Sequence, residues 1–201
     1  MSQLVLHERR ESDAALDGRE PLLGQTPAAQ ENAGARLVSG QLVQVLSAGE
    51  IARTLDARGR LDGLPFMAEM ARHCSKHFRV YRRADMTCVE GHGLRRMRST
   101  VFLQNVRCDG AAHDGCERHC LIFWKEAWLR PVADSGAPLP LDEDCHREDT
   151  GTLLNLPTQE NDRYLCQSTL LVTASTDLPR WNIAPFVSQL RDGELTATRF
   201  A

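Results

Sequence analysis

The sequence predicts a β-rich α+β fold, in which a small bent sheet or an SH3-like barrel carries a helical insertion and a cysteine-rich metal-binding loop. Three observations predict this class: several short segments with alternating apolar residues, helical patterns after the first of them, and cysteines in a glycine-containing loop. The 201 residues, 42% of them hydrophobic, suffice for one domain of ordinary size with tails.

The ordered domain is predicted to begin near residue 38. Residues 1–37 are polar, carry charges of both signs and show no sustained period, which is typical of a flexible N-terminal arm. The stretch QLVQVL (41–46) then alternates as a strand does. We therefore assign residues 38–132 to a β-rich metal-binding domain.

Two helices are expected after this strand. Ser47 stands three residues before Glu50, the spacing of a capping box, so a short helix should start there and end near Gly59. LDGLPFMAEMARHC (61–74) predicts a second helix, with Asp62 as its cap and Pro65 in its first turn.

Further strands are predicted in HFRVYRRA (77–84) and STVFLQNVRC (99–108), because both alternate apolar and polar residues. CLIFWKEAWLRPV (120–132) is too short to type by periodicity, and we expect extended structure at both of its ends. Its aromatic residues, Phe123, Trp124 and Trp128, are expected in the core.

The C-terminal part divides into two predicted regions. Residues 133–163 hold eight acidic residues against two arginines and should form an acidic loop or linker. Residues 164–201 should supply a strand in YLCQSTLLVTAS (164–175) and a helix in LPRWNIAPFVSQLRDGEL (178–195). That helix is expected to dock on the main domain through its apolar residues Trp181, Ile183, Phe186, Val187 and Leu190.

The chain has seven cysteines, an odd number that excludes complete intramolecular pairing. It has no run of 18 apolar residues and its start lacks the order of a signal peptide, so we expect a cytoplasmic protein without a membrane contact. In that reducing compartment such a count indicates metal binding or catalysis rather than disulfides.

A metal site is predicted from Cys88, Cys108, Cys116 and Cys120, since four thiolates suit either a [4Fe-4S] cluster or a tetrahedral zinc. Only the last two have the close spacing of a zinc knuckle, which favours the cluster over zinc. Further candidate ligands are His113, His119, Cys166 and Cys74; each also has an ordinary interpretation, as a solvated histidine or a buried cysteine. Cys145, among carboxylates, is the least suitable ligand.

A basic stretch precedes the cysteine loop, and its seven cations are Lys76, Arg79, Arg82, Arg83, Arg95, Arg96 and Arg98. Strand alternation would place Arg79 and Tyr81 on one exposed face, the type of surface that contacts phosphates and stacks a base. The alternative is a solvated face that pairs with the acidic residues 133–163 or with an acidic protein. A formal net charge of −3 gives no overall reason to expect nucleic acid.

Four stretches, LDGLPFMAEM, FRVYRRAD, RCDGAAHDGC and CLIFWKEAWL, resemble a group of uncharacterised bacterial cysteine-rich proteins that share LDGLPFM and RCDG...C...C.IFWKEAW segments. The likeness covers roughly residues 40–132 and extends to YLCQST. It implies a bacterial protein linked to biosynthesis, and it implies no particular activity.

The leading hypothesis is a small bacterial metalloprotein with an iron–sulfur cluster, acting in metabolism or biosynthesis as a metal-dependent enzyme on a small-molecule substrate or in electron transfer with a redox partner. Four retained thiolates would favour electron transfer or structure over catalysis. One alternative is a zinc-stabilised SH3-like interaction module that binds RNA or an acidic protein. Another is a thiol redox protein that uses Cys116 and Cys120.

Overall fold

A computed structural model describes residues 36–134, 151–179, 181 and 183–191. All of them belong to the larger of two compact units of the chain, Asn32–Ala201. The predicted N-terminal arm lies almost wholly outside the described residues, and so does Cys145. Leu37, one residue before the predicted start of the β-rich domain, is buried.

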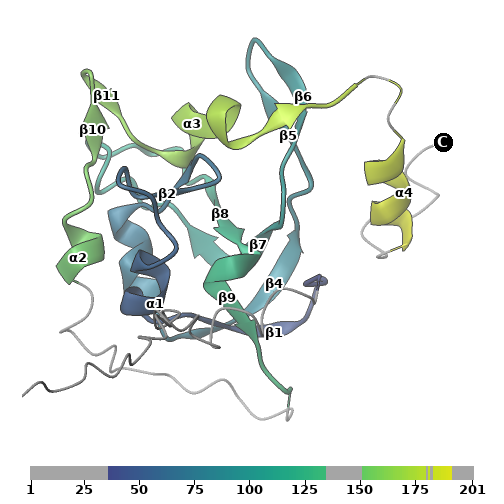
Figure 1. The fold of residues 1–201 in the computed structure, drawn as a ribbon, viewed down its shortest axis with the longest axis horizontal. Helices are drawn as coiled ribbons and strands as arrows, with labels where there is room; N and C mark the ends of the chain where they lie inside the picture. Colours follow the sequence, from purple (N-terminus) through teal and green to yellow (C-terminus); the bar gives the residue numbers. More distant parts are fainter. Residues whose placement is uncertain (1–35, 135–150, 180, 182, 192–201) are drawn as a thin grey trace, which may run out of the picture. The chain divides into compact units, whose positions relative to one another are not determined.

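The main sheet has five antiparallel strands in the order β8-β7-β4-β1-β9 and curls into a half-barrel (Figure 1). Their bounds are Leu121–Lys125 for β8, Thr100–Arg107 for β7, His77–Arg83 for β4, Leu42–Val45 for β1 and Leu129–Pro131 for β9. The predicted strands in 41–46, 77–84 and 99–108 are confirmed, as is extended structure at both ends of 120–132. The β-rich class is confirmed with them.

Two irregularities in strand pairing accompany the curl. The register of β4 against β7 shifts between Val80 and Arg82, and that of β7 against β8 shifts between Phe102 and Arg107. Asn105, inside the second irregularity, has φ of 59°, a left-handed conformation that asparagine tolerates well. Because such bulges bend a strand and increase its twist, they explain how a sheet this small curls around one core.

Aromatic rings are a large part of the buried core. Trp124 and Trp128 are fully buried, and Phe66 packs edge-on against both, with ring centroids 6.3 and 5.3 Å away. The indole N–H of Trp128 donates to the Thr54 hydroxyl at 3.0 Å, which satisfies its one donor. The predicted core positions of these tryptophans are confirmed.

The first predicted helix is confirmed as α1 (Ala48–Ala52), with the capping box in place. The Glu50 carboxylate accepts from the backbone of Ser47 at 2.9 Å, and the Ser47 hydroxyl accepts from the backbone of Glu50 at 3.3 Å. These two bonds satisfy donors that a helix start would otherwise leave unpaired.

The helix predicted over 61–74 is wrong in its first half. Asp62 and Gly63 both have positive φ and form the tight turn of a hairpin between β2 (Arg60–Leu61) and β3 (Leu64–Pro65), as an Asp-Gly pair commonly does. The helical part begins later and is the 3-10 helix η2 (Ala68–His73). Turn chemistry therefore overrides the helical spacing of the apolar residues.

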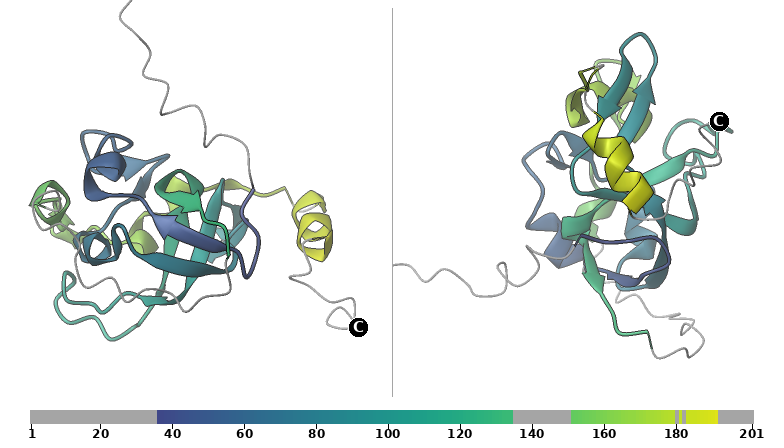
Figure 2. Two further views of the ribbon diagram at one scale, coloured as in Figure 1. Left: turned by 90° about the horizontal axis from the view of Figure 1, so that it is seen from below. Right: turned by 90° about the vertical axis from the view of Figure 1, so that its right-hand side faces the viewer.

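A second, three-stranded sheet has the order β12-β6-β5 and consists of Thr176–Asp177, Gly93–Arg96 and Met86–Val89. Figures 1 and 2 show the β5–β6 hairpin extending away from the main sheet. Arg95, buried on β6, donates to the Ser175 hydroxyl and to the carbonyls of Val172 and Ser175. This arginine joins the hairpin to the chain that follows α3.

The strand predicted over 164–175 is wrong, because this segment forms helix α3 (Gln167–Ala174). Gln167, Leu171 and Ala174 are its buried residues, at the i, i+4 and i+7 spacing of one helical face. A short apolar run fits both the period of a strand and that of a helix, so tertiary contacts determine that this segment is helical.

The acidic region and the basic stretch are in contact, as one of the predictions proposed. Arg79 pairs with Asp134 at 2.6 Å, while Glu160 pairs at 2.8 Å with Arg60, which lies outside the basic stretch. Two other arginines of the basic stretch, Arg83 and Arg95, are buried in ion pairs. Residues 151–164 also carry structure: α2 (Gly151–Leu154) and the hairpin of β10 (Gln159–Glu160) and β11 (Arg163–Tyr164).

The predicted C-terminal helix is confirmed as α4 (Ala184–Arg191). Of its expected docking residues, Trp181 and Ile183 are 91% and 69% exposed and Phe186 is half-buried, and the docking of this helix on the main domain stays a prediction. Within the described ranges, no helix combines the length and apolarity needed to cross a membrane.

The Gln167 side chain holds α3 against the main sheet. Its amide oxygen accepts from the backbone N–H of Phe123 at 2.7 Å, and its amide nitrogen donates to the carbonyls of Phe123 at 2.9 Å and Pro65 at 3.2 Å. All of these groups are buried, so the side chain takes the place of a neighbouring strand at the β8 edge.

Gln167→Ala should lower the free energy of unfolding by about 2–4 kcal/mol, because it leaves a buried N–H and two buried carbonyls without partners. The matched control is Thr173→Ala on the exposed side of the same helix, which should change it by less than about 0.5 kcal/mol. Urea unfolding measures both values. Equal losses in the two variants would contradict a special role for Gln167.

Candidate metal centre

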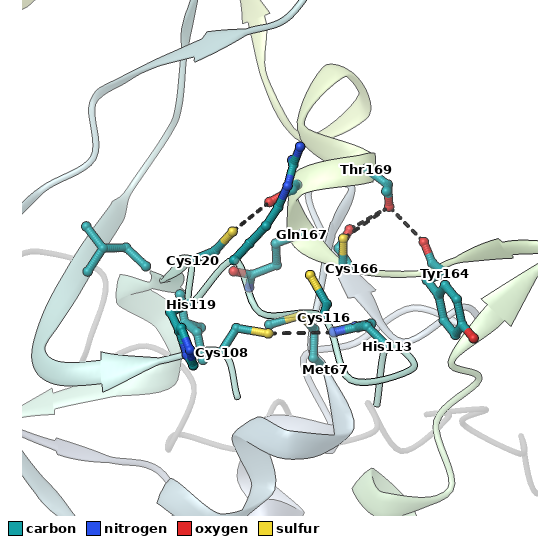
Figure 3. A pocket seen from close by; sticks show the side chains of 14 residues that line it. Met67, Cys108, His113, Cys116, His119, Cys120, Tyr164, Cys166, Gln167 and Thr169 are labelled. Carbon is teal, nitrogen blue, oxygen red and sulfur yellow. Dashed lines mark hydrogen bonds between the residues drawn. The ribbon is translucent and has the colours of Figure 1, made fainter. Parts of the chain in front are cut away.

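One cavity of about 250 Å³ collects six of the cysteine and histidine residues singled out in the sequence (Figure 3). They are Cys108, Cys116, Cys120, Cys166, His113 and His119. In the view of Figure 3 the Cys116 sulfur lies between those of Cys108 and Cys166. The structure thus joins three of the four predicted thiol ligands with Cys166, which had been only a further candidate.

The β7–β8 connection brings the first three cysteines together. Cys108 follows the end of β7 and Cys120 directly precedes β8, and the backbone N–H of Cys108 donates to the Cys120 carbonyl at 2.9 Å. Cys166 arrives from a distant part of the sequence as the N-cap residue of α3. The Gln167 contacts that fix α3 therefore also fix the fourth thiol.

The loop between Cys108 and Cys120 folds tightly on itself. The backbone N–H groups of His113 and Gly115 donate to the Gly110 carbonyl at 2.9 and 3.1 Å, and that of Cys116 donates to the His113 carbonyl at 3.2 Å. Gly110 has φ of 76°, and a Cβ there would lie 2.0 Å from the Cys116 carbonyl oxygen. Only glycine allows this approach, which sets the position of Cys116 relative to Cys108.

Glu69 joins this site from η2, a contribution that the sequence analysis missed. The Cys108 thiol donates to Glu69 Oε1 at 3.3 Å, and His113 Nδ1 lies 3.6 Å from both the Cys108 sulfur and Glu69 Oε1. Among the described residues, this trio is a group of metal-ligand side chains whose ligand atoms all lie within 4.8 Å of one another. The sequence signal for a buried Glu69 is its position within the apolar run FMAEM, because a glutamate is rarely buried without a partner.

One oxygen of the buried Glu69 carboxylate lacks a hydrogen-bond partner among the described residues. The Glu69 side chain is only 4% exposed, and the oxygen without a partner is Oε2. Buried carboxylate oxygens are normally paired, because desolvating an anion without compensation is costly. A bound cation at this oxygen would remove that cost.

The thiol of Cys108 is strongly perturbed by its surroundings. Its pKa is raised to about 11, chiefly by burial and also by the adjacent Glu69 carboxylate, while the backbone N–H of Gly110 acts in the opposite direction. Without metal this cysteine is therefore a neutral thiol at physiological pH, which argues against a free nucleophile. Since metals bind thiolates, metal binding here must release a proton.

Asp109 ties the loop to η2. It pairs with Arg72, and its carboxylate accepts from the backbone N–H of Ala111 at 3.1 Å. These two contacts hold the pKa of Asp109 below its usual value, the Ala111 bond being the larger cause. The loop that carries Cys108 and the helix that carries Glu69 are thereby linked outside the cavity as well.

The remaining predicted ligands lie elsewhere. Cys88 is exposed on β5 and is not among the residues that line the cavity. The reason is topological, since Cys88 belongs to the hairpin that extends away from the main sheet. Cys74 is buried in the core at the end of η2, where it packs as a small apolar residue.

The fold and this site together define a small β-rich protein with a curled half-barrel sheet and a cavity rich in thiols. Comparisons with protein-family models, with curated proteins and with solved structures found no match for this chain.

Gly110→Ala should disturb the cavity, because its new methyl group overlaps the backbone of Cys116. Gly115→Ala is a matched control in the same loop, with a similar φ of 71° but open space around the added carbon. We expect Gly110→Ala to lower the free energy of unfolding by about 1–3 kcal/mol more than the control. Urea unfolding of the metal-free variants measures this difference, and equal values would contradict the close packing of the loop.

Proposed function

We propose that this chain is an iron–sulfur protein, in which Cys108, Cys116, Cys120 and Cys166 bind a [4Fe-4S] cluster, and that it transfers electrons in bacterial metabolism. The observation that carries the proposal is that three thiols of one loop and a fourth from a distant segment line one cavity. Four cysteine thiolates are the usual ligand set of such a cluster.

The spacing of the thiols supports a cluster over a single zinc. Around one zinc with bonds of 2.3 Å, tetrahedral geometry would hold the sulfurs about 3.8 Å apart. Within the part of the chain that the structure describes, no three of these sulfurs form a group with separations within 4.8 Å. This argues against one zinc held by these cysteines, whereas a cluster takes one thiolate at each of its four corners.

The surroundings support electron transfer rather than catalysis at the cluster. Four protein thiolates occupy all four irons, which leaves no position for a substrate. Cys116, Cys120 and Cys166 are each partly exposed, so the cluster would lie near the surface where a redox partner can approach. The Gly110 N–H beside the Cys108 sulfur is the kind of contact that tunes a cluster's potential. Such a cluster fits a cytoplasmic protein, since thiols stay reduced in that compartment.

A second candidate is a zinc site made by Glu69, Cys108 and His113. It is favoured by the short separations within this trio and by the unpaired Glu69 oxygen. Three protein ligands of mixed type, with a fourth position facing a cavity, are typical of catalytic zinc. In that case the protein would act on a small molecule bound in the cavity.

Metal analysis with an absorption spectrum, on protein purified without oxygen, tests the leading proposal. We expect brown protein with about four irons and four sulfides per chain. Cys166→Ser should lose most of this iron, because it removes one of four ligands, whereas Cys88→Ser, at the exposed cysteine outside the cavity, should retain it.

The two candidates predict opposite effects at two residues. Glu69→Gln should keep the iron if the cysteines hold a cluster, and should abolish zinc binding if the trio is the site. If the protein contains one zinc per chain and Cys166→Ser retains it, the zinc site is correct and the cluster is not. Colourless protein without metal would overturn both.

A further inference from the structure

A second cavity, of about 210 Å³, lies at the other end of α3. Its walls come from four separate segments: the β2–β3 turn, the end of β6, the end of β8 and the chain that leaves α3. The lining residues are Asp62, Arg96, Arg98, Lys125, Thr173, Ala174, Ser175 and Thr176. Nothing in the metal-centre proposal uses this cavity.

Positive charge dominates the lining. Arg96, Arg98 and Lys125 face a single carboxylate, that of Asp62. Neither Arg96 nor Arg98 forms an ion pair with another described residue, although other arginines of the same basic stretch do. The cavity therefore contains two guanidinium groups whose charge no described carboxylate neutralises.

Lys125 adds a buried cation. Its side chain is 2% exposed, and its ammonium group donates to Asp62 Oδ2 at 3.0 Å and to the Arg98 carbonyl at 3.1 Å. An ammonium group has three N–H donors, so one is left after these two bonds. Because a buried charge needs full compensation, an anion in the cavity would complete the coordination of this group.

The walls are held in place by contacts outside the cavity. The Asp62–Gly63 turn packs so closely on α3 that a Cβ on Gly63 would lie 2.6 Å from the Thr173 carbonyl oxygen. Arg95 donates hydrogen bonds to the Val172 and Ser175 carbonyls at the C-terminal end of α3. Those carbonyls carry the negative end of the helix dipole, so this arginine offsets a field that would otherwise repel an anion.

We propose that this cavity binds a small anion through a phosphoryl group. Guanidinium groups match the geometry of phosphate oxygens and bind them through paired N–H donors, and the Lys125 ammonium supplies a further charged donor. The volume lies below the roughly 300–1,000 Å³ of typical ligand pockets, which favours a phosphate or a compact phosphorylated molecule over a nucleotide.

Isothermal titration of the full chain with inorganic phosphate and with pyrophosphate tests the proposal. Arg96→Gln and Arg98→Gln should each weaken binding by about tenfold or more, since each removes a charge-assisted hydrogen-bond donor. Both side chains are exposed, so the variants should fold. The matched control is Arg58→Gln, an exposed arginine outside the cavity, which should leave the dissociation constant unchanged.

Asp62→Asn gives a test of opposite sign. It removes the one carboxylate of the cavity while keeping a side chain that tolerates the positive φ of 50° at this turn, so binding should become several-fold tighter. Weaker or unchanged binding in this variant would overturn the proposal.

The metal centre offers an alternative place for an anion, because Arg118 lines that cavity. Arg118→Gln should not affect phosphate binding, and Cys166→Ser should bind phosphate as the wild type does even if it has lost its metal. If Arg118→Gln loses phosphate binding while Arg96→Gln and Arg98→Gln retain it, the anion binds at the metal centre and the proposal is wrong. Absence of measurable binding to the wild type would overturn the site altogether.

Discussion

The contact between the Gln167 side chain and the backbone of Phe123 is the interaction on which the rest of the structure depends. Two buried hydrogen bonds pair the edge of β8 with the first turn of α3, and a third reaches Pro65 on β3. One side chain thereby joins the main sheet, the β2–β3 hairpin and a helix from the C-terminal part of the chain. Cys166 is its immediate neighbour, so the geometry of the thiol cavity follows from the same bonds.

Helix α3 and strand β8 run between the two cavities and contribute to both. Cys120 precedes β8 and Lys125 ends it, while Cys166 caps α3 and Ser175 follows it. The chain thus places soft thiol ligands at one end of this pair of elements and hard cationic donors at the other. The two sets suit different partners, a metal centre and an oxygen anion, without sharing a side chain.

The sequence predicts those features whose cause is local, including the alternating strands and the Ser47–Glu50 capping box. It misassigns α3, because a short apolar run fits either period and the deciding bonds of Gln167 come from residues far away in sequence. The ligand set shows the same limit: proximity in sequence favoured Cys88, whereas strand topology brings Cys166 to the cavity instead. The spacing of the cysteines does not indicate Glu69, whose one sequence signal is its position within the apolar run FMAEM, a position that the structure buries.

The two edges of the main sheet have a consequence for self-association. At β8, the N–H and carbonyl of Phe123 are already occupied by a side chain, and at the opposite edge β9 is only three residues long and ends in Pro131, which has no N–H to offer. A second copy of the chain would find few free backbone donors along either edge. The main sheet is therefore a poor template for strand addition at its two edges, even though it does not close into a full barrel.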